Sequence, residues 1–325
     1  MSLVAYTIQH AVAVVAIDNP PVNALGAAVR QGLAAAVAQA NGDATVTAIV
    51  IASAGKAFIA GADISEFGKP PAPPLLPDLL DAIEASDKPV VAAIQGVALG
   101  GGLEVALACH ARVALPAAKL GLPEIKLGLI PGAGGTQRLP RLIGAAKAFP
   151  MMLSGEPISA GLALEYGLLD EVVSSDVVAA AIRLAEALAA EGRRPVTSAA
   201  TGELTEADRE SFEALAKDAL KKADGMPNVP ALVEAVRATA LPFKEGVAVE
   251  RKLFLSLISD ERSKALRHVF FAEREVAKVP GIGPEVKPRE IASAAVIGAG
   301  TMGGGIAMRF AFASGVSEPR WTEMS

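Results

Sequence analysis

Short apolar runs alternate with segments of helical period over the first 195 residues of the chain. The runs rich in Val, Ile and Ala that predict buried strands are residues 12–17, 47–53, 89–96 and 111–115. The segments that repeat apolar residues at helical spacing are residues 24–40, 77–86 and 103–110. Short strands separated by helices predict a layered α/β fold with mostly parallel strand pairing.

The pattern changes after Pro195. Residues 202–223 and 228–285 are charged, helical in period and poor in strand candidates. Within them, residues 248–280 predict one long amphipathic helix that stops at a Pro-Gly pair. The apolar positions with which this helix could cover the first 195 residues are Leu253, Leu255, Leu257, Ile258, Leu266, Val269 and Phe270.

The end of the chain carries a glycine-rich motif. Residues 293–315 predict a strand, a tight turn and a helix, and the turn fits the dinucleotide-binding fingerprint with Gly298, Gly300 and Gly303. A dinucleotide fold needs further strands, and the sequence after Ala311 predicts none. We therefore interpret the fingerprint as vestigial and expect no NAD binding. An NAD-dependent oxidoreductase stays an alternative that a cofactor titration would distinguish.

The predicted organisation has three parts, which are a core at 1–195, a helical segment at 196–290 and the start of a dinucleotide-binding domain at 291–325. The 325-residue chain has a net charge of -5, so we expect neither a nucleic-acid nor a membrane partner. The single cysteine, Cys109, excludes an intramolecular disulfide. The first residues indicate a strand or hairpin rather than a signal peptide, which favours a cytoplasmic location. No metal is expected.

Two clusters of small residues stand out against the apolar pattern. AFIAGADISEF at 57–67 and ALGGGLEVALACH at 98–110 each join an apolar run to Gly and Ala, with an acidic residue close behind. Tight turns alone would account for the glycines. The second interpretation is that a ligand approaches the backbone N–H groups, which only small side chains allow. The Pro-rich stretch at 68–77 predicts a surface loop beside the first cluster.

Five segments carry a resemblance to a known family. In chain order they are NPPVNAL (19–25), KAFIAGADISEF (56–67), IQGVALGGGLEVALACHARVA (94–114), LGLPEIKLGLIPGAGGTQRLPRLIG (120–144) and ALRHVFFAERE (265–275). Together they resemble the enoyl-CoA hydratase/isomerase (crotonase) family. More closely, they resemble the N-terminal part of a multifunctional fatty-acid β-oxidation enzyme, in which a hydratase precedes a 3-hydroxyacyl-CoA dehydrogenase. In this resemblance the chain is truncated early in the dehydrogenase domain. The resemblance implies an α/β fold of the ClpP/crotonase type, a spiral of ββα units with a helical C-terminal segment.

The resemblance also implies a site. The N–H groups of Ala62 and Gly101 would form an oxyanion hole for an acyl thioester. Glu104 and Glu124 would be the catalytic carboxylates, with Glu124 as proton donor to the α-carbon and Glu104 orienting and activating water. Such work needs a carboxyl that holds its proton, and a poorly solvated site provides this because it raises the pKa of a Glu. The residues expected to contact an acyl-CoA substrate are Ala60, Gly61, Asp63, Ile64, Gly100, Pro131 and Gly132.

The predicted function is a 2-enoyl-CoA hydratase of fatty-acid β-oxidation. Alternatives are a Δ3,Δ2-enoyl-CoA isomerase, which could use the same oxyanion hole and Glu124, and a silent acyl-CoA-binding subunit, which would usually lack a carboxylate. A phosphate-loop interpretation of 130–139 is weak, because the stretch lacks the Gly-Lys-Ser/Thr ending. Acyl-chain length stays open, and so does the oligomeric state: an oligomer fits, and so does a monomer like the multifunctional enzymes.

Four side chains near these motifs receive separate expectations. Many crotonases have Lys after GADI where this chain has Ser65, so Lys56 is the substitute candidate for a CoA phosphate contact. Arg138 and Arg141 are expected to be surface or packing residues. His110 is expected to be structural.

Overall fold

The first residues of the chain form a β-hairpin. The computed structural model describes residues 3–63, 66, 70, 72–276, 281–283, 286, 295–298 and 300–314. In it, β1 (Val4–Gln9) pairs antiparallel with β2 (Val12–Ile17). The two residues between them, His10 and Ala11, have φ values of 49° and 64°. Two consecutive residues with positive φ are typical of the tight turns that join hairpin strands, so the predicted hairpin is confirmed.

The hairpin leads into the main sheet of the molecule, whose order is β1-β2-β3-β4-β6-β9. The further strands of this sheet are β3 (Ala48–Ser53), β4 (Val90–Ile94), β6 (Ala111–Ala114) and β9 (Glu171–Val172). From β2 onward every neighbouring pair is parallel. The layered α/β fold with mostly parallel pairing is therefore confirmed.

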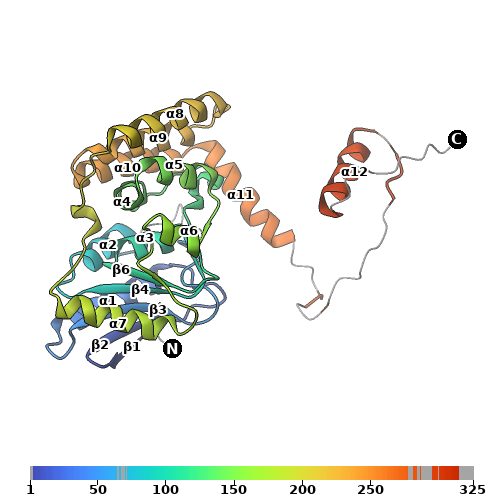
Figure 1. Ribbon diagram of the computed structural model, residues 1–325. Coiled ribbons are helices and arrows are strands. Elements are labelled where there is room, and N and C mark those ends of the chain that lie inside the picture. Colours follow the sequence, from blue (N-terminus) through green and yellow to red (C-terminus); the bar gives the residue numbers. More distant parts are fainter. Residues whose placement is uncertain are drawn as a thin grey trace. The chain divides into compact units, whose positions relative to one another are not determined.

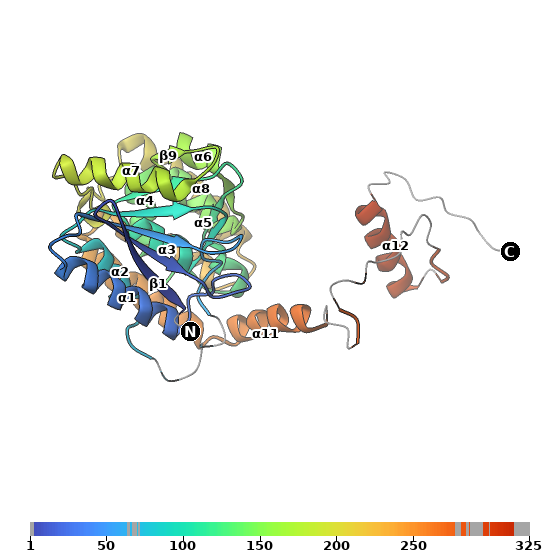
Figure 2. The same ribbon diagram turned by 90° about the horizontal axis from the view of Figure 1, so that it is seen from below.

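Helices cover both faces of this sheet (Figure 2). The helix α7 (Val177–Ala190) packs against one face, where alternate strand residues such as Val50, Val91 and Val113 meet it. The helices on the other face are α1 (Ala27–Gly42), α2 (Leu76–Glu84) and α3 (Gly101–Ala108). Side chains that alternate between the faces of a strand are thus buried on both sides, which explains why the strands are apolar at nearly every position.

The predicted strand at 89–96 is divided between two sheets. After β4 the chain turns at 95–96 and continues as β5 (Val97–Leu99) in a smaller sheet of order β5-β7-β8, with β7 (Lys119–Gly121) and β8 (Ile158–Ser159). An isolated parallel bridge joins Ile59 to Ala98. It brings the first small-residue cluster beside the second, although the two bridged residues are 39 positions apart in the chain.

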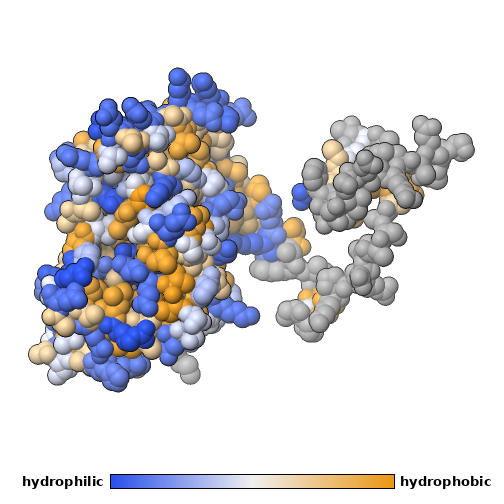
Figure 3. All heavy atoms as spheres, viewed as in Figure 1, coloured by the Kyte–Doolittle hydropathy of each residue, from blue (hydrophilic) through white to orange (hydrophobic). Residues whose placement is uncertain are grey.

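A second helical layer lies over α2 and α3 (Figure 1). Its helices are α4 (Gly135–Ile143), α5 (Ala145–Ser154), α8 (Glu206–Lys222), α9 (Asn228–Arg237) and α10 (Phe243–Ile258), with α6 (Ala160–Glu165) at the side. Phe149 and Phe212 join α5 to α8 edge to face, with ring centroids 5.3 Å apart. Both oxygens of Asp208 accept the first backbone N–H groups of α5. The outer surface of α8 and α9 is mostly hydrophilic (Figure 3).

The predicted long helix at 248–280 is wrong in one respect, because it is broken in two. The helix α10 ends at Ile258 and α11 (Glu261–Val276) begins after Asp260. Ser259 Oγ donates to carbonyl groups of the last turn of α10, while Asp260 Oδ1 accepts the N–H of Arg262. These side-chain bonds end one helix and cap the next.

The predicted apolar cover is correct in part. Leu257 is 3% exposed, and Leu253 and Ile258 pack against the main core. Leu255 and Val269 do not cover anything, since they are 48% and 49% exposed in the chain by itself. The helical segment therefore docks mainly through α10.

The chain divides into two compact units, Met1–Ala272 and Glu273–Ser325. In the second unit, Gly298 has a φ of 103°, and a Cβ on Gly303 would lie 1.8 Å from the Gly298 carbonyl oxygen. The helix α12 (Thr301–Ser314) follows this close turn. Residues 295–298 are not in a strand, so the strand predicted at the start of 293–315 is not observed there, while residues 293–294 lie outside the described residues.

No helix among the described residues is long and apolar enough to cross a membrane. The same described part of the chain contains no group of three or more His, Cys, Asp and Glu side chains placed to hold a metal ion.

Candidate active site

The two predicted backbone donors are adjacent. Gly101 is the first residue of α3, and a Cβ built on it would lie 3.4 Å from the Ala62 nitrogen. No described residue accepts a hydrogen bond from the N–H of Ala62 or of Gly101. Free N–H groups at the first turn of a helix favour a nearby negative charge. Two such donors side by side can stabilise an oxyanion.

Gly100 sets the backbone path that leads into the Gly101 donor. Its φ is 52° with a ψ of −126°, a backbone conformation that side chains disfavour. A Cβ at this position would also lie 2.9 Å from Glu124 Oε1. The glycine is therefore required twice, for the sharp entry into α3 and for the space that the Glu124 carboxyl occupies.

Glu104 lies in the first turn of α3 and is 3% exposed. Its Oε1 accepts the N–H groups of Ala133 and Gly135, each at 2.9 Å. These two donors lie where the glycine-rich loop meets α4, since Gly135 is the first residue of that helix. Glu104 is thus bound to the loop rather than to solvent, and its orientation depends on where that loop lies.

Glu124 lies in the 3₁₀ helix η2 (Pro123–Leu127). The residue as a whole is partly exposed, but its Oε2 is buried and has no hydrogen-bond partner in the part of the chain that the structure describes. A buried carboxyl oxygen without a partner is costly for a folded protein and commonly marks a functional group. The other oxygen, Oε1, lies against Gly100, the residue before Gly101, so a carboxyl with an unpartnered oxygen stands where it can serve as a proton donor to bound substrate.

The electrostatics distinguish the two carboxyls. Burial first, and the Glu104 and Glu250 charges after it, hold the pKa of Glu124 well above its usual value. Burial also raises the pKa of Glu104, but the Ala133 and Gly135 N–H groups and the Arg138 charge act against that rise. Of the two, Glu124 therefore holds its proton more firmly, and Glu104 is the better candidate for the ionised partner.

The other predicted substrate contacts lie around this pair. Ala60 donates its N–H to the Val22 carbonyl, and Gly61 follows it with a φ of 118°. The Asp63 carbonyl accepts the N–H of Glu66, which forms an ion pair with Arg30 at 2.8 Å. Ile64 and Ser65 lie outside the described residues. Lys56 is exposed, and its expected contact with a CoA phosphate stays a prediction.

Pro131 and Gly132 are placed on the loop before α4. A Cβ on Gly135 would lie 2.8 Å from Pro131 Cβ and 2.8 Å from Glu104 Oε1, so Pro131 lies beside the Glu104 carboxylate. A Cβ on Gly132 would lie 2.5 Å from the Phe254 ring of α10. Gly132 therefore serves at least as a packing contact between the loop and the helical segment.

Glu250 is a residue of this site that the sequence analysis missed. It lies on α10, is 0% exposed, and accepts hydrogen bonds from Gly134 and Thr136 of the same loop. Burial and then the Glu104 charge raise its pKa to about 8. Nothing in the local pattern marks this residue, because a Glu within a charged amphipathic helix is normally solvated.

The expectations for Arg138, Arg141 and His110 have different outcomes. Arg138 is a packing residue rather than a surface one, because it is 2% exposed and pairs with Glu84 at 2.8 Å. Arg141 is partly buried and donates to the Thr239 and Leu241 carbonyls. His110 accepts the Val90 N–H on Nδ1, and burial lowers its pKa, which suits a neutral structural histidine.

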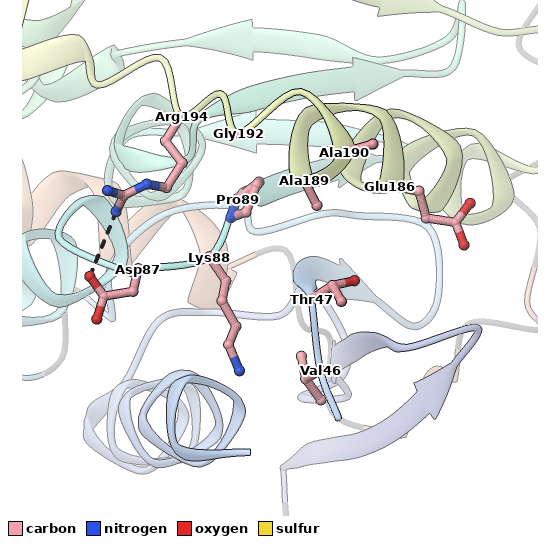
Figure 4. Close-up of a pocket in the computed structure, with 10 residues that line it drawn as sticks. All are labelled: Val46, Thr47, Asp87, Lys88, Pro89, Glu186, Ala189, Ala190, Gly192 and Arg194. Carbon is pink, nitrogen blue, oxygen red and sulfur yellow. Dashed lines mark ion pairs between the residues drawn. The ribbon is translucent and has the colours of Figure 1, made fainter. Parts of the chain in front are cut away.

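A cavity of about 530 Å³ lies elsewhere, at the amino ends of β3 and β4 and the end of α7 (Figure 4). Its cationic side chains already have partners. Lys88 Nζ donates to the Ala40 and Asp43 carbonyls, and Arg194 donates to the Ser86 carbonyl and lies 3.9 Å from Asp87. The cavity contains none of the predicted site residues, and we assign it no chemistry.

The three buried carboxyls predict a pH dependence of stability. Each has a folded-state pKa above the unfolded value of about 4.3, so the folded state binds more protons above that pH. The resulting stability is fully present below about pH 4.3 and is lost as pH rises; for Glu250 the loss continues to about pH 8. Each excess proton lowers the free energy of unfolding by about 1.4 kcal/mol per pH unit.

Thermal unfolding between pH 5 and about pH 8 should measure this loss. The melting temperature of the unaltered chain should fall with rising pH, and Glu250→Gln should show a shallower fall because one of the three groups is removed. Equal slopes for the two proteins would show that Glu250 does not bind a proton in the folded state.

Comparison with known proteins finds a family profile and longer relatives that agree with one another. A family profile described as enoyl-CoA hydratase/isomerase matches residues 7–224. A peroxisomal bifunctional enzyme of Danio rerio is 46% identical over 313 residues, which are 94% of this chain and 43% of that protein. A peroxisomal fatty acid beta-oxidation multifunctional protein of Oryza sativa is 45% identical over 311 residues, with 91% and 43% covered. The chain thus spans less than half the length of these relatives.

Solved structures agree with the sequence relatives. A carnitinyl-CoA dehydratase of Mycobacterium avium is 31% identical, with a TM-score of 0.61, and 83% of this chain and 97% of that one are covered. An enoyl-CoA hydratase of Bacillus anthracis is 29% identical with a TM-score of 0.51, and the coverage is 84% and 96%. They confirm the crotonase fold class predicted from the sequence. The match of the profile to two thirds of the residues shows that the chain belongs to the enoyl-CoA hydratase/isomerase family.

Proposed function

We propose that this chain is a 2-enoyl-CoA hydratase of fatty-acid β-oxidation, which adds water across the C2=C3 bond to give a 3-hydroxyacyl-CoA. The observation that carries the proposal is the Glu124 carboxyl, which has one unpartnered buried oxygen and whose other oxygen lies against Gly100, next to the free backbone donor of Gly101. The names of the relatives, which refer to β-oxidation and to peroxisomal bifunctional enzymes, are consistent with it.

The reaction follows from these groups. The thioester oxygen would accept hydrogen bonds from Ala62 and Gly101 and take up negative charge, which makes C3 electrophilic. Glu104 would take a proton from water while the water oxygen bonds to C3, and Glu124 would give its own proton to C2. The water supplies OH to C3 and H⁺ to Glu104, so one proton must return from Glu104 to Glu124 before the next turnover.

A Δ3,Δ2-enoyl-CoA isomerase activity is the second candidate. It needs the same oxyanion donors and one carboxyl that moves a proton between C4 and C2. Glu124 has the free oxygen for this transfer. The two activities are separated by measuring a 3-enoyl-CoA and a 2-enoyl-CoA on the same preparation.

The direct test is the loss of the conjugated 2-enoyl-CoA absorbance with purified protein, for one short and one long acyl chain. A decrease that depends on enzyme concentration, with 3-hydroxyacyl-CoA as product, supports the proposal. If neither chain length reacts while the protein is folded, the proposal is wrong. The long and short substrates together also give the chain-length preference, which the sequence left open.

The glycine-rich tail is proposed to take no part in this reaction. Deleting residues 293–325 should leave hydration within about twofold of the full chain, because the deleted residues lie outside the hydratase unit, Met1–Ala272. Calorimetry with NAD should show no binding tighter than about 1 mM, or roughly −4 kcal/mol. Micromolar NAD binding that disappears with the deletion would contradict this.

Two further expectations remain proposals. The cytoplasmic location expected from the sequence contrasts with the named relatives, which are peroxisomal. The phosphates of CoA are proposed to contact Lys56, which is exposed near the first small-residue cluster.

A further inference from the structure

Residues 133–136, the 133–136 loop, run into the first turn of α4 and present four successive N–H groups to two different carboxyls. Ala133 and Gly135 donate to Glu104 Oε1, each at 2.9 Å. Gly134 donates to Glu250 Oε1 at 2.6 Å and Thr136 to Glu250 Oε2 at 2.9 Å. Alternate amides of one short stretch therefore bind Glu104 from α3 and Glu250 from α10. Gly134 has a φ of 93°, which lets its N–H turn away from those of its neighbours.

These amides include the unsatisfied donors at the start of α4. The first N–H groups of a helix have no acceptor within it, and Gly135 and Thr136 are the first two residues of α4. Glu104 satisfies one and Glu250 the other. The Thr136 hydroxyl adds a third bond to Glu250 Oε2, at 2.5 Å. Both oxygens of Glu250 are thus acceptors, and neither faces solvent.

We propose that Glu250 is a positioning residue of the hydratase site, which holds the 133–136 loop so that the loop's other two amides orient the Glu104 carboxylate. The inference rests on the proposed function, in which Glu104 activates water. Glu250 does not touch the substrate. Glu250 acts through the loop. A residue of the C-terminal helical segment thus orients a core carboxylate that lies more than one hundred residues away in sequence.

The charged groups around Glu250 are few and come from separate elements. After burial, the Glu104 charge on α3 raises the pKa of Glu250, and the Glu250 charge in turn raises the pKa of Glu124 on η2. Arg138 on α4 lies beside Gly134, where its guanidinium would contact a Cβ. Because Glu250 adds negative charge near Glu124, removing that charge should help Glu124 to lose its proton.

The test replaces Glu250 by glutamine in the full chain. Glutamine keeps the size, but one of its terminal groups is a donor, which must face either the Gly134 or the Thr136 N–H. We expect kcat for hydration to fall about tenfold with KM nearly unchanged, because the general base is misaligned while binding is not. The alkaline limb of the kcat profile should move to lower pH. Glu245→Gln, an exposed change on the same helix, is the matched control.

A second pair of variants protects the test against misfolding. Thr136→Val removes the hydroxyl donor to Glu250 and keeps the shape of the side chain, whereas Thr136→Ser keeps the donor. Thr136→Val should lower kcat in the same direction as Glu250→Gln, by a smaller factor, and Thr136→Ser should not. Glu250→Gln with unchanged kcat and an unchanged pH profile would overturn the proposal.

Residue-resolved amide hydrogen exchange gives a readout that does not depend on activity. If Glu250 positions the loop, Glu250→Gln should speed exchange at Ala133 and Gly135, which bind Glu104, as well as at Gly134 and Thr136. Faster exchange at Gly134 and Thr136 alone would overturn the positioning role. An unaltered chain without hydration activity would refute the proposed function, while the exchange result would still decide whether Glu250 orients the loop.

Discussion

Replacing Glu124 by glutamine is expected to lower kcat for hydration of a 2-enoyl-CoA by about 100-fold or more. The amide cannot give a proton to C2, and loss of a general acid typically costs about 10²–10⁴ in rate. The fold should survive, because Glu124 Oε2 has no hydrogen-bond partner to lose within the described residues. KM should change little, since the N–H donors of Ala62 and Gly101 remain.

Glu104→Gln is the companion variant, and it should differ in a defined way. It should also impair hydration, but it should spare more of any isomerase activity, because moving a proton along the acyl chain needs no activated water. Its fold is more at risk, since glutamine could turn its donor end toward the Ala133 and Gly135 N–H groups. Circular dichroism and a melting curve on each variant control for this. Hydration at the rate of the unaltered chain in either variant would remove that residue from the mechanism.

The motifs that lie within short stretches of sequence were readable in advance. GGGLE and LPEI each carry their own turn signal, and the structure places the Glu124 carboxyl against Gly100, whose carbonyl accepts the N–H of Glu104. Backbone donors are also readable, since only small residues allow the approach of Ala62 to Gly101. The chemistry of each motif is local, even though the site assembles from distant segments.

The support of those motifs was not readable. Glu250 binds residues 114 and 116 positions earlier in the chain, and the helical period of α10 is the same for a buried and a solvated Glu. For Arg138 the sequence left a surface and a packing role open for the same reason, because its partner Glu84 lies on α2. Pairing of charges across separate elements is a property of the tertiary fold, and the spacing of residues along the sequence does not predict it.

The helix break could have been predicted. Ser259 and Asp260 are residues that cap helices, and Glu261 follows them in the first turn, where acidic residues are favoured. The apolar period of 248–280 dominated that local signal. Leu257 on α10 and Leu266 on α11 both face the molecule across the break, while Leu255 does not.

The helical segment supports both carboxyls, which makes its removal the second large prediction. Asn228 Nδ2 on α9 donates to the Ile125 carbonyl, and Ser263 Oγ on α11 donates to the Leu127 carbonyl, so η2 is held on two sides. Glu250 holds the loop that orients Glu104. A chain cut after Gly246 keeps Asn228 but loses Glu250, Leu257 and Ser263.

We expect that cut to give an inactive or unfolded protein. Burial of Leu257 is worth about 2 kcal/mol, and each buried N–H left without an acceptor at Gly134 and Thr136 costs about 1–3 kcal/mol. Their sum is comparable with the roughly 5–15 kcal/mol that keeps a typical domain folded. A chain cut after Gly281 keeps α10 and α11 whole and should match the full chain in melting temperature and in hydration rate. Full activity and an unchanged melting temperature after the shorter cut would show that the core needs neither helix, and that Glu104 and Glu124 are held by the first 246 residues alone.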